Sequence, residues 1–110
     1  MNVVYLEGRL SSDPVLRELS SGSRLLSLEV STATDSGTAN VPVAWFDPPA
    51  IPGWMAGTDV VVRGVVKRRF FRGAAGTQSR TEVVATEVCD LAKRRQAQRV
   101  LERAVDALGS

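Results

Sequence analysis

The chain has 110 residues, 44% of them hydrophobic, which suits one small globular domain. It contains no histidine, so it lacks the usual general base and the commonest metal ligand, and its single cysteine excludes an internal disulfide. No apolar run approaches the roughly 20 residues that cross a membrane, and the N-terminus does not read as a secretion signal. We therefore expect a cytoplasmic protein that is not an enzyme, binds no metal or other cofactor, and does not associate with membranes.

Charge is distributed unevenly along the chain. Residues 1–62 hold three arginines against seven acidic residues, a net charge of −4. Residues 63–110 hold eleven basic and five acidic residues, a net charge of +6. A basic face attracts polyanions, but a solubilising surface without a partner has the same composition, so the charge leaves both interpretations open.

Strands and turns are predicted for the first half of the chain. Residues 2–10 form a valine-rich strand, and the Ser-Ser-Asp-Pro sequence at residues 11–14 is typical of a turn. Apolar and polar residues alternate over residues 25–33, the period of a half-buried strand. A hairpin connection at residues 34–38 then leads into a third strand over residues 41–46.

The next segments complete a predicted set of five strands. Residues 47–57 contain three prolines, which prevent a long helix. A fourth strand begins at residue 59 and carries a bulge or sharp bend at Gly64, and a Gly/Ala turn at residues 73–76 separates it from a fifth strand over residues 80–88. Five strands with a bent fourth favour a small closed barrel, because closure removes exposed edges. An open five-stranded sandwich is the alternative.

The C-terminal segment has a different period. Apolar residues recur at offsets of three and four over residues 91–108, which predicts one amphipathic helix with a strongly basic remaining surface. Asp90 is the expected N-cap and Gly109 the expected terminator. The apolar stripe can pack on its own barrel, on a sister subunit or on an acidic partner.

Residues 63–72 hold five basic residues, no acidic ones and two aromatic rings. In an extended strand, alternate side chains share a face. One face then carries Lys67, Arg69 and Phe71, and the other carries Arg68, Phe70 and Arg72. Cations that contact phosphates, beside a ring that stacks an unpaired base at about 1–3 kcal/mol, are typical of single-stranded nucleic-acid binding. The alternative is that the rings cap the barrel and the cations only solubilise the hairpin.

Two tryptophans are further candidates for base stacking. Trp45 lies beside Phe46 in a strand, so one of the two rings should face the core and the other the outside. Trp54 lies in the proline-rich connection, where it either packs over the barrel end or stacks on a base.

Several segments of residues 1–89 occur in a recognisable order. They are Gly8-x-Leu10 at the end of the first strand, Asp13-Pro14-x-x-Arg17, the alternating strand, Gly57-x-x-Val-Val-Val-x-Gly64, a basic strand ending at Phe71, and Thr81-Glu-Val-Val84. This ordered set resembles the bacterial single-stranded DNA-binding protein family.

The resemblance implies an all-β domain over residues 1–89, a five-stranded OB-fold barrel, with the helix of residues 90–110 appended. It also implies a homo-oligomer, a dimer or tetramer, that binds single-stranded DNA at the nucleoid in replication, repair or recombination. It places aromatic stacking positions at Trp45 and Phe71, and it matches Arg17. Together with the reasoning from the residues themselves, the expected DNA contacts are Arg17, Trp45, Trp54, Lys67, Arg68, Arg69, Phe70, Phe71 and Arg72.

The chain departs from this family at three places. The hairpin near residues 34–40 is short and lacks an aromatic, the proline-rich segment replaces a helix, and a basic helix stands where the family has an acidic recruitment tail. The resemblance is thus to a short, tail-less variant. The alternative function is an OB-fold interaction or assembly subunit of a replication-restart or repair complex, with weak DNA binding and a protein partner held by the helix.

Overall fold

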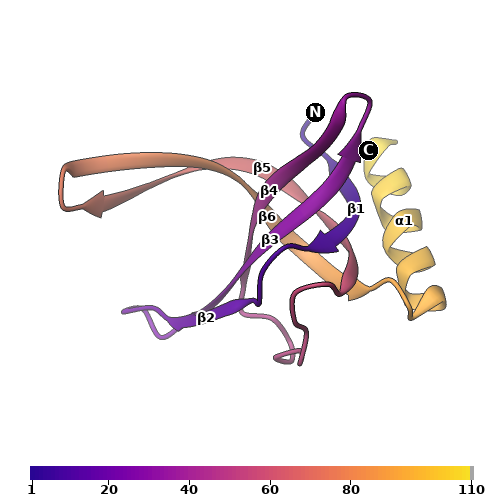
Figure 1. Cartoon of the computed structure of the whole chain (residues 1–110), viewed down its shortest axis with the longest axis horizontal. Helices are drawn as coiled ribbons and strands as arrows, with labels where there is room; N and C mark the ends of the chain where they lie inside the picture. Colours follow the sequence, from indigo (N-terminus) through magenta and orange to yellow (C-terminus); the bar gives the residue numbers. More distant parts are fainter. Residues whose placement is uncertain (110) are drawn as a thin grey trace.

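Six strands and one helix form the structure, a computed structural model that describes residues 1–109. Their bounds are β1 (Val4–Leu10), β2 (Val15–Glu18), β3 (Arg24–Thr34), β4 (Gly37–Phe46), β5 (Asp59–Gly73), β6 (Gly76–Asp90) and α1 (Arg94–Leu108) (Figure 1). The predicted hairpin turn between β3 and β4 and the turn at residues 73–76 are confirmed. The short strand β2 was not predicted, and β5 and β6 are longer than expected because their pairing continues to the tip of their hairpin.

Five of the strands close into a barrel. β1 pairs antiparallel with β5 on one side and, at Arg9 and Leu10, with β3 on the other. β3 pairs with β4, β4 pairs in parallel with β6, and β6 pairs with β5, which completes the circle. β2 adds to the edge of β3 outside this ring. The expected all-β fold with a closed five-stranded, OB-fold-like barrel and one C-terminal helix is therefore confirmed.

The barrel interior is filled by alternate residues of each strand. On β3, Leu26, Leu28 and Val30 point inward and are almost fully buried, as their spacing predicts. Val60 and Val62 of β5 meet them from across the barrel. Each such side chain contributes about 1.5–3 kcal/mol by leaving water, so this layer supplies the main stabilisation of the fold.

The proline-rich segment closes one end of the barrel without a helix. Residues 47–58 contain no helix or strand, in agreement with the three prolines. Trp54 in this segment packs against the barrel core. The Asp13 carboxylate accepts a hydrogen bond from the Ala56 amide at 2.8 Å, which ties the segment to the turn after β1.

Helix α1 begins later than the sequence suggests. The Leu91 amide still donates to the Asp59 carbonyl at 3.0 Å, so the chain remains tied to the sheet edge at that point. The Asp90 carboxylate accepts from the Ala92 amide within a turn, and Lys93 takes the N-cap position without a side-chain cap. The prediction of Asp90 as N-cap is therefore wrong, whereas Gly109 does terminate the helix.

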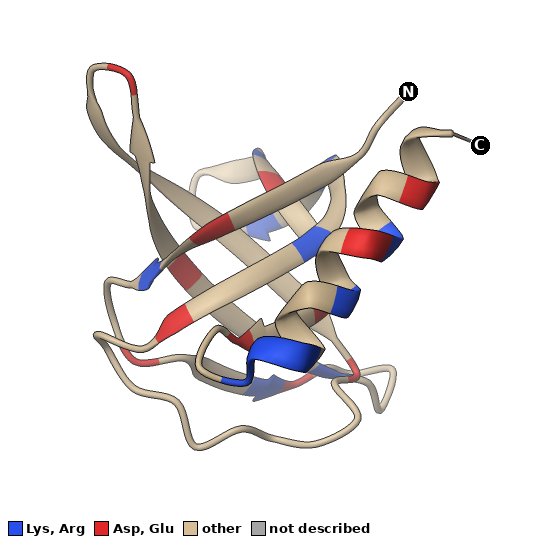
Figure 2. Ribbon diagram, turned by 90° about the vertical axis from the view of Figure 1, so that its right-hand side faces the viewer, with Lys and Arg blue, Asp and Glu red and all other residues tan. Residues whose placement is uncertain are grey.

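The helix docks on its own barrel. Ala97 and Val100 of α1 pack with Val61 of β5 and Cys89 of β6, and Tyr5 borders this second core. Its basic residues concentrate toward the N-terminal half (Figure 2), an arrangement that opposes the helix dipole. Docking, rather than capping or charge placement, therefore holds the helix in place.

One carboxylate joins the helix to the barrel. Glu87 of β6 accepts from the Arg63 guanidinium at 2.6 Å and from two nitrogens of Arg103, each at 2.9 Å. The hydrogen bonds with Arg103, more than those with Arg63, lower the pKa of Glu87 below its ordinary value, against the opposing effect of burial.

Gly64 marks the predicted bulge, where the β5–β6 register shifts. A Cβ atom at this position would collide with the Val84 carbonyl oxygen. We expect Gly64→Ala to lower the free energy of unfolding by about 1–3 kcal/mol, because the strands must separate to make room. Urea denaturation measures this loss. Gly53→Ala is the matched control, since a Cβ there meets nothing within 4 Å, and equal losses in both variants would contradict the packing argument.

Glu87→Gln removes the charge that holds Arg63 and Arg103. We expect a loss of about 1.5–3 kcal/mol in the free energy of unfolding at neutral pH, the range for hydrogen bonds to charged groups. Because the folded-state pKa of Glu87 is lowered, its contribution is present above the ordinary value of 4.5 and is lost as the pH falls through the lowered pKa. Urea denaturation at neutral and acidic pH should therefore show the two proteins converging in acid, and a gap independent of pH would contradict this origin.

Candidate nucleic-acid interface

The outer half of the β5–β6 hairpin, residues 67–82, extends well beyond the barrel (Figure 1). We call it the distal hairpin. Its two strands pair continuously, from Lys67 opposite Glu82 to Gly73 opposite Gly76. Gly76 has φ of 105°, a left-handed conformation that glycine adopts without strain, so it allows the tight turn at the tip.

Basic and aromatic side chains lie on both sides of this two-stranded ribbon. The Phe70 face carries Arg68, Phe70 and Arg72, and the Phe71 face carries Lys67, Arg69 and Phe71, as strand alternation predicts. Phe70 is 67% exposed and Phe71 40% exposed. Neither ring is buried in the barrel core, so the alternative that both rings only cap the barrel does not describe their positions.

The Phe71 face has its arginines engaged by carboxylates. The Arg69 Nε atom lies 3.0 Å from Oε2 of Glu82, whose side chain is only 2% exposed. Arg80, which pairs with Arg69 across the hairpin, places a guanidinium nitrogen 2.9 Å from Oε1 of Glu29 on β3. The Arg80–Glu29 contact ties the base of the hairpin to the barrel, whereas the Arg69–Glu82 contact joins the two hairpin strands. Both arginines are thereby committed to protein partners.

The Phe70 face carries no carboxylate. The residues opposite Arg68, Phe70 and Arg72 on β6 are Thr81, Ser79 and Thr77. Within residues 1–109, Arg68 and Arg72 form no ion pair, and the same holds for Lys67 on the other face. Three exposed cations of the distal hairpin are therefore available to an anionic ligand.

The two tryptophans lie away from the hairpin. Trp45 is 7% exposed within the core, so of the pair it is Trp45 and not Phe46 that turns inward. Its ring stacks on that of Trp54 with a centroid distance of 6.1 Å and an interplanar angle of 12°. Burial leaves little of the Trp45 ring exposed, and one face of Trp54 is occupied by Trp45, so base contacts by these two rings stay predictions.

Arg17 is the remaining predicted contact. It lies on β2, opposite Leu25 of β3, and its side chain is exposed. No ion pair holds it within the described residues. The structure thus brings the cations and rings of residues 67–72 together and leaves Arg17 and the tryptophans on other parts of the barrel.

Three charged residues at this surface escaped the sequence analysis: Glu29, Arg80 and Glu82. Arg80 could have been found by pairing residues outward from the turn at 73–76, which sets it opposite Arg69. Glu82 follows from the same register, one pair beyond Arg68 and Thr81. Glu29 carries no such signal, because its contact with Arg80 depends on the closure of the barrel.

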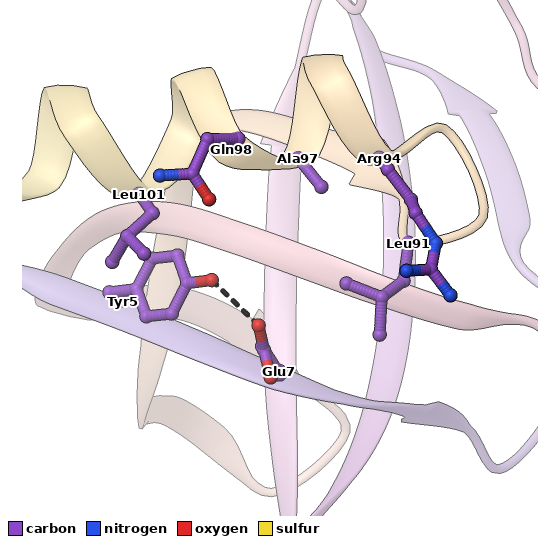
Figure 3. Close-up of a pocket in the computed structure, with 7 residues that line it drawn as sticks. All are labelled: Tyr5, Glu7, Leu91, Arg94, Ala97, Gln98 and Leu101. Carbon is purple, nitrogen blue, oxygen red and sulfur yellow. Dashed lines mark hydrogen bonds between the residues drawn. The ribbon is translucent and has the colours of Figure 1, made fainter.

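A second candidate site is a groove of about 320 Å³ between α1 and β1 (Figure 3). Tyr5 and Leu101 line one end, and Leu91 and Arg94 line the other. The Tyr5 hydroxyl donates to a Glu7 carboxylate oxygen at 2.8 Å. Burial, followed by this hydrogen bond, raises the pKa of Tyr5 to about 12. The groove lies along the line where α1 docks beside β1.

The protein has a single tyrosine, so its ionisation can be followed directly by ultraviolet absorbance. We expect Tyr5 to titrate near 12 in the folded protein, against an ordinary value of 10.0. Because the folded-state pKa is raised, the associated stability is present below pH 10.0 and is lost as the pH rises toward 12. Glu7→Gln should lower the Tyr5 pKa partway, since burial persists, and an unchanged value would show that Glu7 has no part in the shift.

Residues 1–109, the part of the chain that the structure describes, contain neither a metal-binding cluster nor a membrane-spanning helix. No group of three or more histidine, cysteine, aspartate or glutamate side chains is placed to hold a metal ion. No helix in this part of the chain is long and apolar enough to cross a membrane. Comparison of the sequence with protein-family models and with curated proteins finds no match.

Proposed function

We propose that this protein binds single-stranded DNA through its distal hairpin. The observation that carries the proposal is the Phe70 face, where the most exposed ring of the hairpin lies between two arginines that form no ion pair within residues 1–109. A flat exposed ring stacks an unpaired base, and flanking guanidinium groups contact the phosphates on either side. The proposal extends to a role in DNA replication, repair or recombination through the sequence resemblance described above.

The barrel supports this proposal by its topology. OB-folds bind oligonucleotides on their second and third strands and on the loops that flank them, among them the hairpin between the fourth and fifth strands. In this chain the corresponding hairpin joins β5 and β6, and it carries the exposed cations Lys67, Arg68 and Arg72. Duplex reading instead uses hydrogen-bonding side chains aimed at base edges, whereas the rings here suit unstacked bases.

Within the distal hairpin, the Phe70 face is the principal binding surface. The resemblance alone assigns stacking to Phe71. On the Phe71 face, however, a phosphate must compete with Glu82 for Arg69 and with Glu29 for Arg80. Arg68 and Arg72 meet no such competition, so the local field beside Phe70 is more favourable to an anion.

The second candidate function is that of an assembly subunit with weak DNA binding. Val105 and Leu108 of α1 are 56% and 53% exposed, although their spacing continues the apolar stripe of the docked helix. An exposed apolar stripe suits contact with another protein, including a second copy of the chain. Light scattering of the wild type and of the Val105→Glu/Leu108→Glu variant measures the molar mass of each protein in solution. A lower mass in the variant favours assembly through the helix.

Titration with oligo-dT, followed by fluorescence anisotropy of labelled DNA, tests the proposed function. We expect Phe70→Ala to weaken binding by about tenfold, within the 1–3 kcal/mol of a stacked base. Arg68→Ala/Arg72→Ala should weaken it further and flatten its salt dependence. With two phosphates contacted by Arg68 and Arg72 on the Phe70 face, the slope of log K against log salt should be about −1.4 for single strands.

Two variants serve as matched controls. Met55→Ala removes an equally exposed apolar side chain, and Arg95→Ala/Arg99→Ala removes two exposed charges from α1. Both should bind oligo-dT like the wild type. Undetectable binding at low salt, or equal losses in the control and hairpin variants, would overturn the proposal.

A further inference from the structure

The distal hairpin has an exposed aromatic ring on each of its two faces. Phe70 and Phe71 are adjacent in β5, so their rings leave opposite sides of the ribbon. Beyond the barrel, neither side is covered by another element (Figure 1). Both rings are exposed, and a free cation accompanies each of them, Arg68 on one face and Lys67 on the other.

A single strand does not reach both rings easily. The ribbon is one peptide layer thick, with an unpaired backbone edge along each strand of the distal hairpin. A single DNA strand must therefore bend sharply around an edge of the ribbon, or over its tip at residues 73–76, to stack on both rings. Two strands that diverge from a common branch pass on opposite sides of the ribbon without such a bend.

On this basis, which rests on the proposed function, we infer that the preferred ligand is branched DNA, with one unpaired strand on each face of the hairpin at the fork. The Phe70 face holds the first strand through Arg68 and Arg72. The Phe71 face holds the second through its ring and Lys67. Anchorage of the hairpin base by Arg69–Glu82 and Arg80–Glu29 keeps the ribbon extended between the two strands.

The two faces of the distal hairpin differ in how strongly they attract an anion. Because Glu82 and Glu29 neutralise two arginines there, the Phe71 face is the weaker of the two for an anion. A single strand should therefore occupy the Phe70 face first. The Phe71 face adds affinity only for a second DNA strand that is tethered close to it. A branch provides this tether, because binding of the first arm on the Phe70 face raises the effective concentration of the second arm at the Phe71 face.

The test compares DNA ligands that differ only in where their unpaired arms lie. The fork has two non-complementary dT arms at the same end of a duplex, each of about six nucleotides, within the site size of one OB-fold. The control has the same duplex and arms with one arm at each end. A dT strand as long as both arms together and the blunt duplex complete the set.

We expect the fork to bind about tenfold more tightly than the control with separated arms. Phe71→Ala is the informative variant, because it should abolish this preference while lowering the affinity for the dT strand by a smaller factor than the affinity for the fork. Phe70→Ala should weaken binding to both ligands.

Equal affinity for the fork and the separated arms would overturn the branch inference and leave the proposed function standing. So would a loss in Phe71→Ala that is the same for the dT strand as for the fork, which would indicate one continuous surface. Binding of the blunt duplex as tight as that of the fork would instead indicate groove recognition by the ribbon and contradict the inference. Failure of every ligand to bind would overturn the proposed function itself.

Discussion

The buried carboxylate of Glu82 lies where the β5–β6 ladder leaves the barrel, and the orientation of the distal hairpin depends on it. A charge withdrawn from water is tolerated only with a partner, and Arg69 supplies one at 3.0 Å. Arg80 extends the contact to Glu29 on β3, so the hairpin is braced against a strand that is separated from β6 by β4 in the sheet order. An isolated two-stranded ribbon is only marginally stable in water, so this bracing gives the projecting segment a defined direction.

The same ion pairs divide the charge of the hairpin into two kinds. Arg69 and Arg80 pair with carboxylates of the protein, Glu82 and Glu29. Arg68, Arg72 and Lys67 form no ion pair within residues 1–109. Counting basic residues in the sequence therefore overstates the charge that a ligand meets. The proposed function follows from this division, since it assigns the principal stacking role to Phe70, where the resemblance alone would assign it to Phe71.

Much of the fold could be predicted because local sequence patterns, such as the alternation of apolar and polar residues along a strand, decide it. Leu26, Leu28 and Val30 face inward by alternation alone, and Gly64 marks the bulge. The site was harder to predict because its features depend on register and closure. Which of Trp45 and Phe46 turns inward is set by pairing with β3, and the Glu29–Arg80 contact exists only once the barrel has closed. The late start of α1 has a similar origin, since a sheet hydrogen bond from Leu91 overrides a local cap signal.

Ultraviolet cross-linking of oligo-dT, followed by mass spectrometry of the modified peptides, shows directly whether a bound base stacks on Phe70. A base stacked on an aromatic ring lies in contact with it, so the cross-link reports which ring is used. We expect the main product to join thymine to Phe70, with the peptide around Trp45 and Trp54 unmodified because Trp45 is buried and stacked against Trp54. Cross-links confined to the tryptophan pair or to α1 would contradict this expectation.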